Sequence, residues 1–134
     1  MLQAYSNNIQ GTANSAIPFN NVKVEKGCST NLTAPSTIQL NKAGVYMVAC
    51  NASFTPDAAG VSSIQLSKNG VLQPDAQSSV TAIANSTDTL NFYALVQVRE
   101  NNTCSCCSSP TTLQVIQGID GTFENVNICV TKIC

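Results

Sequence analysis

Residues 44–54 and residues 90–98 carry apolar side chains on both of their alternating faces. In an antiparallel sheet, one face normally meets the core and the other meets water, so apolar and polar residues alternate. A second apolar face would be exposed on a small single chain unless something covered it. We therefore predict that copies of the chain cover this face. The side chains expected at the contact are Tyr46, Val48, Tyr93 and Leu95.

The rest of the chain also has strand signals, and no segment has the sustained spacing, cap and stop of a helix. Strands are expected at residues 3–7, 16–19, 22–26, 37–40, 45–54, 62–68, 80–84, 89–99, 112–117 and 126–133. Turn residues separate them, including Pro74-Asp75 and Asp120-Gly121, and Asn69-Gly70 is the clearest tight hairpin. About eight to ten short strands at this spacing predict an all-β, two-sheet antiparallel jelly-roll sandwich. We expect one domain spanning residues 1–134.

Charge is sparse in this chain. Only 10% of the residues are charged and the net charge is −1. The six basic residues are scattered singly along the sequence, which argues against nucleic-acid binding. No run is long enough for a membrane span, and residues 1–5 do not resemble a secretory signal. We therefore expect a protein made in a cytoplasm.

The residue types needed for catalysis are poorly represented. The chain contains no histidine, so neither a Ser-His-Asp nor a Cys-His arrangement can form. The acidic residues lie mostly in predicted turns, where Asp57, Asp75 and Asp120 sit beside proline or glycine. We expect no enzyme activity, no cofactor and no metal site.

Seven cysteines are unusual for such a chain: Cys28, Cys50, Cys104, Cys106, Cys107, Cys129 and Cys134. Disulfides are the favoured interpretation, and an odd count leaves one thiol for an interchain bond or unpaired. Plain buried or free thiols are the second interpretation. A metal site at Cys104-Ser105-Cys106-Cys107 is the third, although there is no paired Cys-x-x-Cys.

Two short motifs resemble a known superfamily. Residues 38–46 (IQLNKAGVY) and residues 64–71 (IQLSKNGV) are similar to motifs of the trimeric jelly-roll proteins that include tumour necrosis factor and the complement globular heads. The likeness is closest to bacterial and phage versions, such as the C-terminal domain of the Bacillus collagen-like exosporium protein. The resemblance implies a homotrimer, with the sheet that holds residues 45–54 and 89–99 around the threefold axis. It also implies that Cys28, residues 104–107 and Cys134 share one end, and that Cys50 and Cys129 lie on neighbouring strands.

The resemblance, without a collagen stalk, suggests a structural virion protein of a bacteriophage. We expect a trimeric capsid decoration or head-surface protein, assembled in the host cytoplasm and bound to the major capsid protein or another virion protein. Residues 1–19 are either an extended attachment segment or an ordinary first strand. The alternatives are a receptor-binding or adhesion tip for a host glycan or protein, with recognition by residues 55–60 and 75–79, and a bacterial spore or cell-surface trimer.

Overall fold

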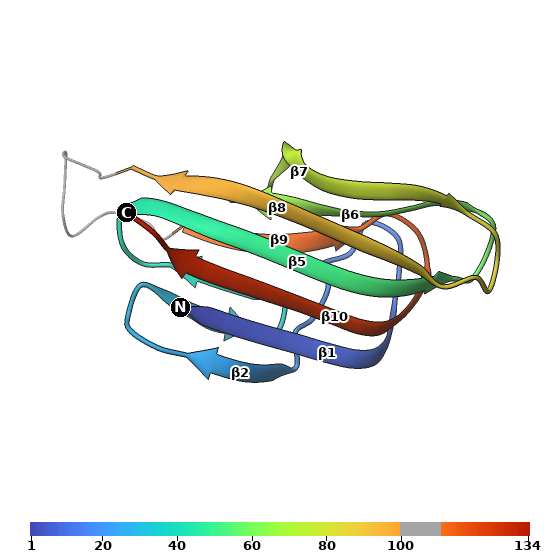
Figure 1. The fold of residues 1–134 in the computed structure, drawn as a ribbon, viewed down its shortest axis with the longest axis horizontal. Helices are drawn as coiled ribbons and strands as arrows, with labels where there is room; N and C mark the ends of the chain where they lie inside the picture. Colours follow the sequence, from blue (N-terminus) through green and yellow to red (C-terminus); the bar gives the residue numbers. More distant parts are fainter. Residues whose placement is uncertain (100–110) are drawn as a thin grey trace.

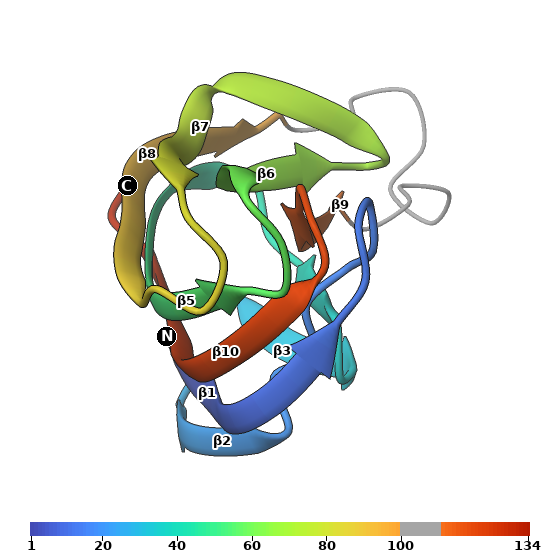
Figure 2. The same cartoon turned by 90° about the vertical axis from the view of Figure 1, so that its right-hand side faces the viewer.

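The computed structural model describes residues 1–99 and 111–134, which form two antiparallel sheets of five strands each. The first, here called the β5 sheet, has the order β2-β1-β10-β5-β8, and the second, the β6 sheet, has the order β3-β4-β9-β6-β7. Figure 1 shows the strands running along the long axis, and Figure 2 shows the sheets packed face to face. The strands are β1 Leu2–Gly11, β2 Asn21–Glu25, β3 Thr30–Ala34, β4 Thr37–Leu40, β5 Gly44–Pro56, β6 Gly60–Lys68, β7 Val71–Ala82, β8 Asp88–Val98, β9 Thr111–Gln117 and β10 Gly121–Lys132. The predicted all-β sandwich is confirmed.

The core lies between the sheets and is built by period-two alternation. Every second residue of β5 from Tyr46 to Phe54 is buried, and β6, β8, β9 and β10 repeat the pattern. Phe54 and Phe123 pack with their ring centroids 4.6 Å apart and tilted by 48°, a favourable aromatic geometry. The two apolar segments predicted from sequence are therefore adjacent core strands, because β5 and β8 pair from Gly44 with Val98 to Phe54 with Asp88.

The two ends of the sandwich carry different turns and loops. The end that carries Met1, Cys134 and the turns at residues 26–29 and 41–43 is called the terminal end, and both termini lie there in Figure 1. The opposite end carries the loops at residues 57–59 and 118–120 and is called the far end. No helix that could span a membrane is found in the part of the chain that the structure describes.

The segment 16–19 is not the strand we expected. Only Ala16 forms a bridge, to Ile116. Pro18 has no N–H to donate, and the neighbouring Ile17 and Phe19 are buried as core side chains instead. Their backbone N–H groups donate to Val115 O at 2.8 Å and to Pro35 O at 2.7 Å. The segment therefore crosses the edge of the sandwich and closes its core.

The β6 sheet departs from the sequence prediction at two strands. β3 was not expected, because Thr30–Ala34 is mostly polar; it forms because β4 pairs with it at the edge of the sheet. The predicted break at Pro74-Asp75 is wrong, since both residues lie inside β7, and the expected strand 80–84 is only its last part. An edge strand tolerates proline because one side of it needs no ladder hydrogen bonds.

The hairpin at Asn69-Gly70 is confirmed. Both residues have positive φ, 52° and 84°, as a type I′ turn requires. The Asn69 N–H donates to Thr112 O at 2.9 Å, and the Thr112 N–H donates back to Asn69 Oδ1 at 2.9 Å. The turn that joins β6 to β7 is therefore also fastened to β9.

Residues 1–19 belong to the sandwich. β1 lies between β2 and β10, and Leu2, Ala4 and Ser6 are buried. Ser6 Oγ donates to Pro18 O at 2.7 Å and accepts from the Asn20 N–H at 2.8 Å. This placement agrees with the ordinary first strand and does not agree with an extended attachment segment.

Candidate functional site

The outer face of the β5 sheet carries exposed apolar side chains on β8 and half-buried ones on the neighbouring β5. Tyr93 and Leu95 of β8 are 63% and 55% exposed. The register pairs Tyr93 with Ala49 and Leu95 with Met47, so these side chains lie on one surface. We call this surface, with the half-buried Val45 beside Met47, the outer apolar patch. It is the second apolar face that the sequence predicted.

The sequence assigned Tyr46 and Val48 to this contact, and that assignment is wrong. Both have no exposed surface in a single chain. Tyr46 pairs with Val96 and Val48 with Ala94, all on the core side. The Tyr46 hydroxyl donates to Lys42 O at 2.7 Å, and burial raises its pKa. On the outer face, the residues that pair with Leu95 and Tyr93 are Met47 and Ala49. Because both faces of β5 are apolar, composition alone did not show which face points outward.

Toward β1, the same face becomes polar. Asn125 Nδ2 donates to Asn7 Oδ1 at 2.7 Å, and Asn127 Nδ2 donates to Asn125 Oδ1 at 3.1 Å. These two bonds join the three amides into a row. An apolar area with a polar border is the usual composition of a protein contact surface.

Cys50 and Cys129 lie on neighbouring strands, as the resemblance implied, but on opposite faces of the sheet. Cys50 pairs with Ile128 in the core, and Cys129 pairs with Ala49 on the outer face. Cys28, Cys50, Cys129 and Cys134 form no disulfide with one another, so the favoured disulfide interpretation is wrong for any pair drawn from these four. Cys104, Cys106 and Cys107 lie outside the described residues.

The described thiols differ in their environment. Burial raises the pKa of the Cys50 thiol to about 12. Cys28 is exposed, and a hydrogen bond and the positive charge of Lys42 hold its pKa below the usual range for a thiol. The same interaction raises the pKa of Lys42. A thiolate is the reactive form of cysteine, so Cys28 is the more nucleophilic of the two.

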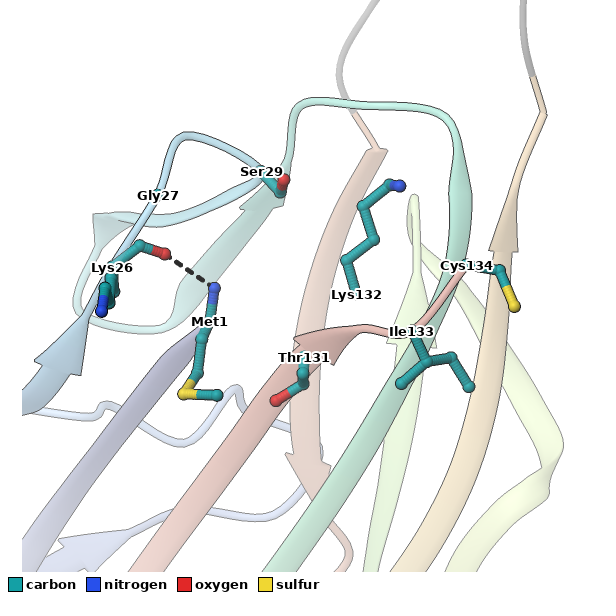
Figure 3. Close-up of a pocket in the computed structure, with 8 residues that line it drawn as sticks. All are labelled: Met1, Lys26, Gly27, Ser29, Thr131, Lys132, Ile133 and Cys134. Carbon is teal, nitrogen blue, oxygen red and sulfur yellow. Dashed lines mark hydrogen bonds between the residues drawn. The ribbon is translucent and has the colours of Figure 1, made fainter.

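A cavity of about 480 Å³ opens at the terminal end, as Figure 3 shows. The N-terminal amine of Met1 donates to Lys26 O at 2.9 Å, and both residues line the cavity. Lys132 reaches over Gly44, where an added Cβ would lie 2.6 Å from Lys132 Cε and would also meet Cys134 O. The cavity is lined by Met1, Lys26, Gly27, Ser29, Thr131, Lys132, Ile133 and Cys134.

A second cavity of about 300 Å³ lies at the far end, beside Ala58, Ala59 and Ile119. Asp120 Oδ1 accepts from the Ala13 N–H at 2.6 Å, and Asp57 Oδ2 accepts from Gln10 Nε2 at 2.8 Å. These carboxylates hold neighbouring loops together, which agrees with their interpretation as turn residues. Within residues 1–99 and 111–134, no group of three His, Cys, Asp or Glu side chains could hold a metal ion.

Of the two predicted recognition loops, only one is a loop. Residues 57–59 connect β5 to β6 at the far end and are exposed. Residues 75–79 form part of β7, so the prediction of a loop there is wrong.

No family model matches the sequence, and no curated protein matches it. Among solved structures, the chain is similar to the globular domain of zebrafish complement 1qA protein, with a TM-score of 0.74 and 10% identity over 99% of this chain and 96% of that one. It is similar to Eiger TNF from S. frugiperda, with the same TM-score and identity over 99% and 92% of the two chains. For murine APRIL, the TM-score is 0.68 with 8% identity over 98% of each chain. At such identities, the similarity shows the shared jelly-roll fold of C1q and TNF proteins and nothing more.

Proposed function

We propose that this chain is a non-enzymatic structural protein that forms a homotrimer through the outer apolar patch. The observation that carries the proposal is the exposure of Tyr93 and Leu95 beside Met47 and Ala49, on a sheet whose other face already forms the core. Burying a side chain of this kind completely contributes about 1.5–3 kcal/mol. Since these two are 63% and 55% exposed, roughly half of that remains available for each. The number of copies, three, follows the resemblance of residues 38–46 and 64–71 to trimeric jelly rolls.

The finer assignment is a decoration protein on the surface of a bacteriophage capsid, related to the bacterial and phage versions of this fold. It is supported by the resemblance of residues 38–46 and 64–71 to bacterial and phage jelly rolls, and the sparse charge and the lack of histidine argue only against nucleic-acid binding and His-dependent catalysis. A receptor-binding or adhesion tip is the second candidate, and the exposed Ala58-Ala59 loop beside the far-end cavity favours it. Apolar loop residues next to a cavity are typical of recognition surfaces.

The trimer is tested by light scattering of the purified protein with and without reductant. We expect a mass of three 14.0 kDa chains in both conditions, because the patch rather than a disulfide holds the copies together. Tyr93→Asp should give monomers, since a charge in the patch would be desolvated without a partner. The matched control is Val61→Asp, which changes another exposed apolar residue on β6 and should leave the trimer intact.

A monomeric wild-type protein would contradict the proposal, and so would a Tyr93→Asp variant that remains trimeric. The decoration role is tested separately, by sedimenting the phage capsids that are released when infected cells producing the chain lyse. Protein that sediments with capsids supports decoration. Protein that stays in the supernatant but binds intact host cells favours the adhesion tip.

A further inference from the structure

The basic residues, which are scattered in sequence, gather at the terminal end of the molecule. Lys26 follows the end of β2, Lys42 precedes β5, and Lys132 ends β10 beside Tyr46. Arg99 follows Val98, which pairs with Gly44 at the start of β5. Lys68 Nζ donates to Gln97 O at 2.7 Å, and Lys23 lies between the residues of β2 that pair with Gln3 and Ala4. All six basic side chains therefore lie in the half of the sandwich that carries the termini.

Most of the described acidic residues lie at the far end. Asp57 and Asp120 occupy adjoining loops, where the Asp57 N–H donates to Asp120 O at 3.1 Å. Asp88 pairs with Phe54, and Glu124 accepts a hydrogen bond from Thr55 Oγ1. Among the described residues, only Glu25 and Asp75 are acidic in the terminal half. An amine at Met1 and a carboxylate at Cys134 have opposite charges and leave this balance unchanged. Among the described residues, basic side chains thus prevail at the terminal end and acidic side chains at the far end.

Two of these basic residues line the cavity at the terminal end. Lys26 and Lys132 belong to its lining, which contains no acidic side chain among the residues described. Met1 and Thr131 supply apolar atoms between the two lysines in the view of Figure 3, and Ile133 adds apolar lining on the other side of Lys132. A carboxylate on a short aliphatic stem matches this combination, because its charge meets the lysines and its stem meets the apolar atoms. Such a group is the side chain of a glutamate or aspartate.

We propose that the terminal end docks onto an acidic protein surface, with carboxylate side chains entering the cavity between Lys26 and Lys132. The inference rests on the proposed function for its choice of a protein partner. A nucleic acid fits less well, because the lysines surround an open cavity with apolar lining and form no stripe along which a phosphate backbone could run. The acidic far end would point away from the docked surface, since like charges repel.

The test uses immobilised poly-L-glutamate as the probe and measures binding of the full chain by interferometry at low and moderate salt. We expect saturable binding that weakens by about tenfold when the salt is raised, as screened electrostatic contacts do. The double variant Lys26→Gln/Lys132→Gln should lose about tenfold in affinity or more. The matched control Val61→Asp/Ile83→Asp lowers the net charge by the same amount at exposed positions near the far end and should bind as the wild type does.

Equal losses in the two double variants would overturn the proposal, because net charge alone would then explain the binding. Binding to duplex DNA or heparin but not to poly-L-glutamate would also overturn it, in favour of a phosphate or sulfate polyanion. Lys26→Glu provides a second variant at an exposed position if Lys132→Gln lowers the melting temperature. Light scattering of the same samples separates this result from the proposed function. A trimer that does not bind poly-L-glutamate contradicts the proposed docking but not the proposed trimer.

Discussion

The chemical behaviour of a residue in this protein is decided by the side chains around it more than by its type. Cys28 and Cys50 show this most directly. Cys50 faces the core on β5, where no partner stabilises a thiolate and burial raises the pKa to about 12. Cys28 lies in an exposed turn beside Lys42, whose hydrogen bond and charge stabilise the thiolate and lower the pKa. Cys50 is therefore placed as a small apolar residue, and Cys28 forms the reactive thiolate more readily than Cys50 does.

This difference predicts the order in which thiols react with iodoacetamide at neutral pH. Cys28 should be modified early and Cys50 only on unfolding, because the thiolate is the reacting species and must be accessible. Lys42→Gln should slow the modification of Cys28 by about threefold to tenfold, since it removes the charge that stabilises the thiolate. Peptide mapping by mass spectrometry measures both rates. Lys68→Gln, at a different turn, is the control, and an equal slowing in that variant would contradict the role of Lys42.

At the scale of the element, two glycines lie at strand boundaries for different physical reasons. Gly70 has a φ of +84° in the β6–β7 hairpin, and an added Cβ would meet open space. Gly44 has a φ of +146° at the start of β5, and an added Cβ would press on Cys134 O and on Lys132. The first position requires glycine for its backbone conformation alone. The second requires it also because the last residues of the chain cross directly over β5.

Alanine substitutions should separate these two requirements. Gly70→Ala should lower the free energy of unfolding by about 1 kcal/mol, the cost of a left-handed conformation in a residue with a Cβ. Gly44→Ala should lower it by about 3 kcal/mol, because backbone strain and a close contact combine. Urea unfolding of a monomeric background such as Tyr93→Asp measures both values without the complication of assembly. Equal losses of unfolding free energy in the two variants would show that the packing of Cys134 and Lys132 over Gly44 adds nothing to the cost of the Gly44→Ala substitution.

At the scale of the whole molecule, the two sheets differ in what their outer faces expose. The β5 sheet exposes the outer apolar patch, and in the described part of the chain basic side chains prevail at the terminal end and acidic ones at the far end. In a cyclic trimer, symmetry gives every copy the same environment. If the axis runs along the strands, three basic terminal ends lie side by side. Assembly would then turn the charge separation of one chain into a single basic surface with threefold symmetry.

Assembly also links stability to concentration. If folded copies associate and unfolded ones do not, the melting temperature must rise with protein concentration. We expect a rise of about 5 °C between roughly 1 and 100 µM, given the usual entropy of unfolding for a domain of this size. Tyr93→Asp should melt at a temperature independent of concentration, while Val61→Asp should follow the wild type. Scanning calorimetry or intrinsic fluorescence measures this. A wild-type melting temperature that does not change would contradict a folded oligomer.

Local pattern was sufficient for much of the fold and insufficient at particular residues. Alternation identified the core strands, and Asn69-Gly70 identified its hairpin, because both signals depend only on neighbouring residues. The segment 16–19 was mistaken for a strand, since an apolar crossover that fills the core has the same composition as a strand. β3 was missed because a polar edge strand obtains its structure from the strand beside it.

By itself, the sequence determined that this protein is an all-β sandwich with too many apolar strand faces for one small core. It did so because apolar residues alternate with period two along the sequence, and this local pattern is enough to predict buried strand faces. Only the tertiary structure decided which face of β5 is exposed, that Cys50 and Cys129 lie on opposite faces, and that six scattered basic residues share one end. Each of these depends on strand pairing between residues far apart in the chain, and register and direction are set by packing across the whole molecule.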